Sequence, residues 1–254
     1  MNKKVMSFIL TIMLSLSVIS LVGCVEGIPG YGIDTVILEN GLKITNGVVV
    51  SYDGEGKENV DLVIPEKVDG DMVVTEIGKK AFNGATSIKT ISIPKTIKKV
   101  GDMAFRGCTN LEAVNITSLV SWCSLTFNSN STPFANATCK KMYVNGELLT
   151  NLILPEGIKT VGAYTFFRCT SITRIEVPNN VTLIYPNAFG FLSHNLTEFK
   201  FNNPNNWYAL SSETEGMATG YHMYNIHLST NEGEKNAIAM LQNGASSYWK
   251  RFEV

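Results

Sequence analysis

The chain has 254 residues, of which 44% are hydrophobic and 17% are charged, and its formal net charge is -1 at pH 7. This composition is ordinary for a globular protein, and the length allows one extended domain or two small ones. Phosphate binding needs clustered Lys and Arg side chains, and no run of like charge occurs here, so the sequence predicts no nucleic-acid partner.

The first 23 residues have the pattern of an export signal. Lys3 and Lys4 give a positive start, and residues 5–21 are almost entirely apolar or Ser/Thr. An uncleaved membrane anchor is the alternative, because this apolar stretch is near the lower length limit for spanning a bilayer. The segment closes with LVGC, which resembles the lipobox of bacterial lipoproteins and ends at Cys24. The resemblance implies export to the bacterial cell surface, with lipid on Cys24 holding the chain to the membrane.

The next two segments are interpreted as a tether and a cap. Residues 24–33 are rich in Gly and Pro without periodicity, which is typical of a linker. Within residues 34–59, Asn-Gly pairs at 40–41 and 46–47 stand between β-rich runs, the pattern of tight hairpins. We therefore expect residues 34–59 to form a β-hairpin cap over the exposed edge of the sheet that follows.

An internal repeat dominates the middle of the chain. The sequence IKTISIPKTIKKVGDMAFRGCTN begins at Ile88, and ITRIEVPNNVTLIYPNAFGFLSHN begins at Ile172. Phe82 and Phe105 are 23 residues apart, and so are Phe166 and Phe189. Such a period predicts stacked units, each too small to bury its own apolar edge. We expect a mainly β solenoid of about five coils over residues 60–201, with a parallel strand ladder.

Each unit contains the parts of one coil. Ile91 and Ile93 alternate as the buried face of a strand, and Pro94 ends that strand because it lacks a backbone N–H. Gly101 permits the corner, and Phe105 fills the interior. A small-residue turn then returns the chain to the next strand.

The unit resembles the repeat of the BspA-like leucine-rich repeat family, close to LxxIxIPxxIxxIGxxAFxGCxx. The resemblance covers roughly residues 42–252, including an insertion at 117–150, although Ala85 replaces the usual Cys. It implies adhesion or attachment to host or matrix proteins.

Residues 202–254 are expected to form a C-terminal cap. Thr230 or Asn231 can begin a short helix with apolar residues at Ile238 and Leu241, and Gly244 can end it. The sequence YWKRFEV that follows has the composition of a strand.

No residue pattern indicates catalysis, a cofactor or a metal site. Cys108 recurs as Cys169 in the same repeat position, which favours packing over a nucleophile. Cys123 and Cys139 lie in the insertion, and either a disulfide or two buried thiols fits their spacing. The histidines at 194, 222 and 227 lack convergent ligands.

The outward positions of the strand ladder are the candidate binding residues. They mix both charges with small polar groups, which suits recognition of a protein partner by a repeat-built face. The candidates are Lys89, Thr90, Ser92, Glu112, Asn115, Thr173, Arg174, Glu176, Glu198 and Lys200. Three hypotheses follow: a non-catalytic surface adhesion module, a structural or assembly component of the cell envelope that binds envelope proteins, and an enzyme with a site in the insertion. We favour the first.

Overall fold

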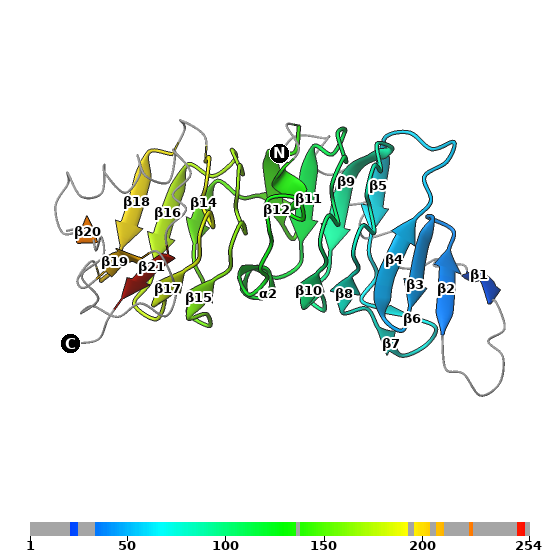
Figure 1. Cartoon of the computed structure of the whole chain (residues 1–254), viewed down its shortest axis with the longest axis horizontal. Helices are drawn as coiled ribbons and strands as arrows, with labels where there is room; N and C mark the ends of the chain where they lie inside the picture. Colours follow the sequence, from blue (N-terminus) through cyan, green and yellow to red (C-terminus); the bar gives the residue numbers. More distant parts are fainter. Residues whose placement is uncertain are drawn as a thin grey trace.

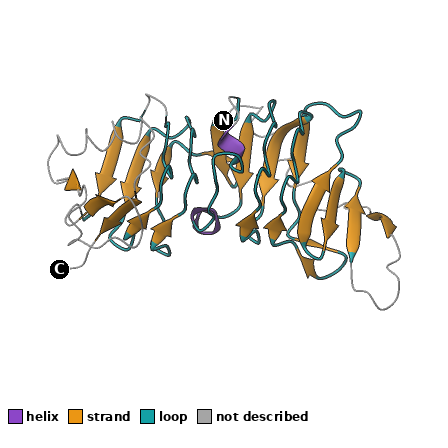
Figure 2. Ribbon diagram, viewed as in Figure 1, coloured by secondary structure: helices purple, strands orange, loops and turns teal. Residues whose placement is uncertain are grey.

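Strands make up most of the regular structure, and they stack along the long axis of the molecule (Figures 1 and 2). The structure is a computed structural model that describes residues 21–24, 34–135, 138–192, 196–203, 207–210, 224–225 and 248–251. The predicted mainly β solenoid with parallel ladders is confirmed.

The longer strand of each coil lies on one side of the molecule, where the strands form two sheets (Figure 1). The first sheet contains β5 (Val60–Val63), β9 (Ile88–Ile93), β11 (Ala113–Ile116), β12 (Lys141–Val144) and β13 (Glu147–Leu148). The second contains β14 (Asn151–Ile153), β16 (Arg174–Val177) and β18 (Glu198–Phe201). All neighbours are parallel except β13, which turns back antiparallel to β12 and ends the first sheet.

Shorter strands form the opposite layer. They are β8 (Glu76–Ile77), β10 (Lys99–Val100), β15 (Thr160–Val161) and β17 (Leu183–Ile184). In the ladder strand β9, Ile88, Ile91 and Ile93 are buried while the residues between them are partly exposed. Apolar side chains of the two layers meet in one continuous core, because neither layer can bury its inner face alone.

The N-terminal cap is built from hairpins, as the Asn-Gly pairs predicted. Within the predicted residues 34–59 the strands are β2 (Thr35–Leu38), β3 (Leu42–Thr45) and β4 (Val48–Tyr52). Outside those bounds, β1 (Leu21–Cys24) pairs with β2, and β6 (Lys67–Val68) forms a hairpin with β7 (Met72–Val73). Asn46 and Gly47 both have positive φ, 49° and 73°, which is the geometry of a two-residue type I′ turn. Strand β4 then pairs in parallel with β8, so the cap continues the short-strand layer.

The coil corner shows why its glycine is needed. A Cβ on Gly101 would collide with the backbone nitrogen of Lys79 in the preceding coil, so close approach excludes a side chain there. The left-handed conformation falls instead on Met103, with φ of 56°. The same conformation recurs at the equivalent residues Lys80, Tyr164 and Asn187.

Phenylalanines fill the interior of the turns. The rings of Phe82 and Phe105 are stacked at 5.2 Å between centroids, and those of Phe166 and Phe189 at 5.6 Å. All four side chains are 1% exposed or less, so each contributes about 2 kcal/mol of burial free energy. The 23-residue period therefore reflects aromatic stacking between successive coils.

The insertion forms an altered coil. It contains α2 (Leu119–Cys123), capped by the Ser118 side chain, and the 3₁₀ helix η1 (Pro133–Ala135). The carbonyl of Cys123 accepts a hydrogen bond from Gly162 N at 3.0 Å, and Phe127 N donates to the carbonyl of Ala163 at 2.9 Å. The segment therefore occupies the position of a short strand between β10 and β15, although its sequence does not follow the repeat.

The C-terminal end of the short-strand layer is closed by β19 (Trp207–Leu210), β20 (Tyr224–Asn225) and β21 (Tyr248–Arg251). Strand β21 pairs antiparallel with both β17 and β19, which confirms the strand expected within YWKRFEV. The Trp249 ring stacks on Phe201 at 6.3 Å and 11°. The helix expected between residues 230 and 244 lies outside the described residues.

Candidate functional site

Two rows of outward side chains cross β14, β16 and β18, and we call this surface the second ladder face. One row aligns Asn151, Arg174 and Glu198, and the other aligns Ile153, Glu176 and Lys200. Both rows follow from the strand period of two, which sends alternate side chains outward. The four charged candidates on these strands are thus brought together, as the sequence predicted.

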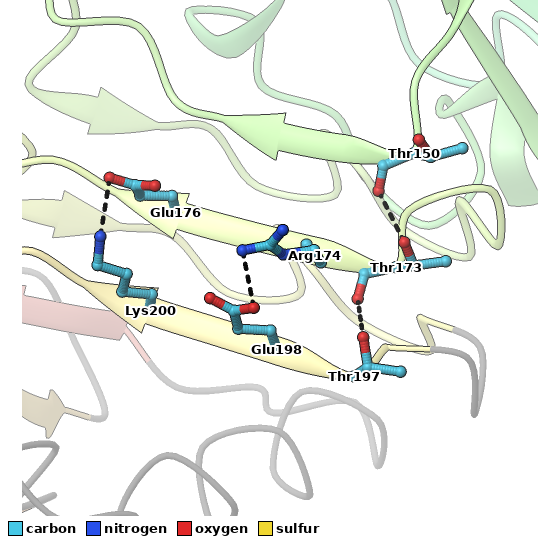
Figure 3. A network of polar contacts seen from close by, with 7 residues as sticks. All are labelled: Thr150, Thr173, Arg174, Glu176, Thr197, Glu198 and Lys200. Atoms are coloured by element: carbon cyan, nitrogen blue, oxygen red, sulfur yellow. Dashed lines mark hydrogen bonds and ion pairs between the residues drawn. The ribbon is translucent and has the colours of Figure 1, made fainter.

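The charges of this face are paired across neighbouring strands (Figure 3). Arg174 Nη2 lies 2.8 Å from Glu198 Oε2, and Lys200 Nζ lies 3.4 Å from Glu176 Oε1. Opposite charges in directly facing positions stabilise a sheet modestly. Strand β16 supplies the cation of one pair and the carboxylate of the other, so the four side chains form an alternating charge pattern with no net charge.

Hydrogen bonding keeps Glu176 ionised. The Asn202 side chain, the Lys200 ammonium and the Arg174 guanidinium together hold the pKa of the Glu176 carboxyl below its ordinary value. Glu176 therefore carries its negative charge at neutral pH.

Threonines fix the start of each strand on this face (Figure 3). Thr173 Oγ1 donates to the carbonyl of Thr150 at 3.2 Å, and Thr197 Oγ1 donates to the carbonyl of Thr173 at 3.1 Å. Their hydroxyl groups are occupied with the backbone of the preceding coil. Thr173, a predicted partner-binding residue, is thus at least partly a structural residue.

An exposed apolar side chain borders the charged pairs. Ile153, directly opposite Glu176 in the register, is 53% exposed, and Leu148 on β13 is 45% exposed. The sequence interpretation did not include these two residues, although both stand at outward positions of the strand pattern. Ile153 adds an apolar margin to the second ladder face.

The other predicted residues belong to the first sheet. Lys89, Thr90 and Ser92 on β9 are partly exposed, and Glu112 before β11 is exposed. Thr90 Oγ1 donates to Asp61 Oδ1 at 2.7 Å on the neighbouring strand.

Asn115 is not available to a partner, contrary to the expectation that it faces outward. Its side chain is only 5% exposed, because the turn between β12 and β13 lies over it. Gly146 N donates to Asn115 Oδ1 at 3.0 Å, and Asn115 Nδ2 donates to Ser92 Oγ at 3.4 Å. Asn115 therefore anchors the hairpin of β12 and β13. The alternation of residues along the strand could not predict that this hairpin covers Asn115.

The candidate residues consequently divide between two surfaces. The first sheet ends at the hairpin of β12 and β13, and the second ladder face belongs to the separate sheet of β14, β16 and β18. The second ladder face combines ion-paired side chains of both charges on two adjacent ladder strands, so it is the stronger candidate.

Four cysteines of the described chain are buried thiols. Cys108, Cys123, Cys139 and Cys169 are all unpaired, which excludes the disulfide between Cys123 and Cys139 in this structure. Cys108 Sγ donates to the carbonyl of Phe82 at 3.0 Å. Burial raises the pKa of Cys108, Cys123 and Cys169 to about 12, and raises that of Cys139 as well. Such thiols are poor nucleophiles, which agrees with the packing interpretation.

Cys139 is a repeat cysteine that the sequence analysis missed. The thiols of Cys108 and Cys169 both lie close enough to raise the pKa of Cys139 further. Met142 is buried three residues after Cys139, as Leu111 is after Cys108. The chain between Cys108 and Cys169 thus forms one additional coil of the solenoid rather than an irregular loop.

No group of three or more His, Cys, Asp and Glu side chains that could hold a metal ion occurs in the described segments. The histidines at 194, 222 and 227 lie outside them. Within the same segments no helix has the length and apolar character to span a membrane. Cys24 ends β1, which pairs with β2 at the edge of the sheet that β1, β2, β3, β4, β8 and β10 form. Residues 25–33 of the predicted tether are outside the described residues.

Comparison with known proteins matches residues 66–142 and 136–214, more than half of the chain, to the model of the BspA type leucine-rich repeat region, in six copies. A search of curated proteins finds no match. A leucine-rich cell surface protein of Faecalibacterium prausnitzii is 20% identical, with 68% of this chain and 50% of that chain covered and a TM-score of 0.35. A leucine-rich repeat protein of Bacteroides ovatus is 23% identical, with 69% of this chain and 41% of that chain covered and a TM-score of 0.39. The chain thus spans half or less of these two proteins.

Proposed function

This chain belongs to the BspA-type leucine-rich repeat family, and on that premise we propose that it is a non-catalytic binding module of the cell surface. Its partner in this proposal is a host or matrix protein, bound through the second ladder face. The observation that carries the proposal is the alternating charge pattern of Arg174, Glu176, Glu198 and Lys200. The two cations are exposed, the two carboxylates are partly exposed, and neighbouring strands hold all four in register.

The physical argument concerns specificity. Cross-strand pairing holds each charged group in a defined place. A partner whose surface has the complementary charge pattern can therefore bind four side chains that are already ordered. The exposed Ile153 beside them offers apolar surface, and burying that surface against a partner favours binding. A rigid polar face with an apolar margin suits reversible recognition of another protein's surface.

Export and attachment through lipid on Cys24 form part of the same proposal. They place the module outside the cell, where host and matrix proteins are met. The support is the signal pattern of residues 1–23 and the LVGC sequence.

The experiment is a retention assay. The mature chain without residues 1–23 is immobilised and exposed to host surface and matrix extracts, and retained proteins are identified by mass spectrometry. We expect a retained host or matrix protein that is lost on reversing Arg174 and Glu176 together. Retention of bacterial envelope proteins only, with no host protein bound, would instead support a structural role in the envelope.

A further inference from the structure

The turn after β15 and the turn after β17 place bulky side chains where earlier coils have glycine. The equivalent residues of four coils all have positive φ: Gly84 (75°), Gly107 (77°), Arg168 (57°) and Phe191 (54°). Non-glycine residues avoid this conformation because Cβ approaches the backbone, and a bulky aromatic residue there is unusual. Strained residues of this kind are held in place by the structure around them, and they cluster at functional sites.

These side chains form one ordered cluster. The Arg168 guanidinium lies over the Phe167 ring and over the Phe191 ring, at 5.4 Å from each centroid. Arg168 Nη1 also donates to the carbonyl of Ala135 at 3.4 Å, and Tyr164 packs against Phe167 at 5.1 Å. The long Arg side chain is therefore held in place before any partner arrives, which lowers the entropic cost of binding.

The cluster is open to solvent and its charge is not neutralised within the described chain. Phe191 is 46% exposed, and Arg168 is exposed as well. Arg174 and Lys200 are paired with carboxylates, whereas Arg168 forms no ion pair with any residue that the structure describes. An ordered guanidinium thus stands beside an exposed aromatic ring, and no carboxylate of the described residues pairs with it.

We propose that Arg168 and Phe191 form a docking point for a protein partner whose contacting segment presents a carboxylate beside an apolar side chain. The guanidinium binds the carboxylate through charge-assisted hydrogen bonds, and the apolar side chain covers the Phe191 ring. A single cation suits a single carboxylate, because attraction to a polyanion such as an acidic polysaccharide depends on many cations in contact. This surface is distinct from the second ladder face and goes beyond the proposed function.

The test uses a phage-displayed library of random 12-residue peptides, panned on the mature chain. Enriched peptides are synthesised, and their affinities are measured by fluorescence anisotropy for the wild type and for R168Q and F191G. The variant R106Q is the matched control, because Arg106 is an exposed arginine in an equivalent turn whose guanidinium contacts Met103 rather than aromatic rings.

We expect enriched peptides to carry Asp or Glu beside an apolar residue and to bind R168Q and F191G at least tenfold more weakly. R106Q keeps the wild-type affinity, and amidation of the peptide carboxylate abolishes binding. F191G unfolds at the wild-type temperature or above it, because glycine relieves the left-handed strain. Equal affinity for all variants, enrichment of peptides without carboxylates, or no enrichment would overturn the proposal, as would binding of polygalacturonate alone. Loss of binding in second-ladder variants but not in R168Q would leave the proposed function standing without this docking point.

Discussion

Substitution of Asn115 by alanine tests whether this residue is a structural anchor or an outward contact. In the wild type, Gly146 N donates to Asn115 Oδ1 at 3.0 Å inside the covered turn. The alanine variant leaves the buried Gly146 N–H without its acceptor. An unsatisfied buried amide costs about 1–3 kcal/mol, so we expect the free energy of unfolding to fall by about that amount.

Urea unfolding followed by tryptophan fluorescence measures this loss. The midpoint should move to lower urea concentration with an unchanged slope, because the surface exposed on unfolding is the same. Glu112→Ala is the matched control, since Glu112 is exposed beside the same strand, and its effect should stay within about 0.5 kcal/mol. A loss below about 0.5 kcal/mol for Asn115→Ala, together with lost partner retention, would refute the reasoning and restore Asn115 as a contact.

Three further predictions concern the thiols, the coil corners and the lipid. Burial raises the pKa of the Cys108 and Cys169 thiols from 9.0 to about 12. Above pH 9 the unfolded chain therefore loses these protons while the folded chain still holds them, so the midpoint of urea unfolding should fall as the pH rises. Cys108→Ala should make that fall shallower, and an unchanged slope would contradict the burial argument. Gly162→Ala places a Cβ against the carbonyl oxygen of Leu125 and should destabilise the fold by about 1–3 kcal/mol, whereas Gly157→Ala, with no neighbour closer than 4.0 Å, should not. Radiolabelled palmitate should enter the wild type and not Cys24→Ala, and labelling of both would exclude Cys24 as the lipid site.

The repeat made the architecture predictable because its signals are local. Pro94 ends its strand, Asn46 and Gly47 form their turn, and the phenylalanines stack at the period they show in the sequence. Each of these features depends on neighbouring residues or on the adjacent coil alone. They therefore appear as a regular pattern along one sequence.

Two of the features that were missed depend on contacts made by the insertion. Strand alternation places Asn115 outward, and only the hairpin turn at Gly146 buries it. Cys139 lies outside the 23-residue period, so its repeat position emerges only when its coil stacks between those of Cys108 and Cys169. The left-handed conformation of Phe191 was likewise hidden, because the sequence there differs from the glycine of the earlier coils.

The most direct test of binding through the second ladder face is a charge exchange that preserves the sheet. The variant R174E/E176R/E198R/K200E keeps both cross-strand pairs but inverts the charge pattern, so its stability should stay within about 1 kcal/mol of the wild type. Biolayer interferometry of a retained partner should then show affinity at least tenfold weaker than that of the wild type. Unchanged affinity, with the fold intact, would contradict recognition through this face.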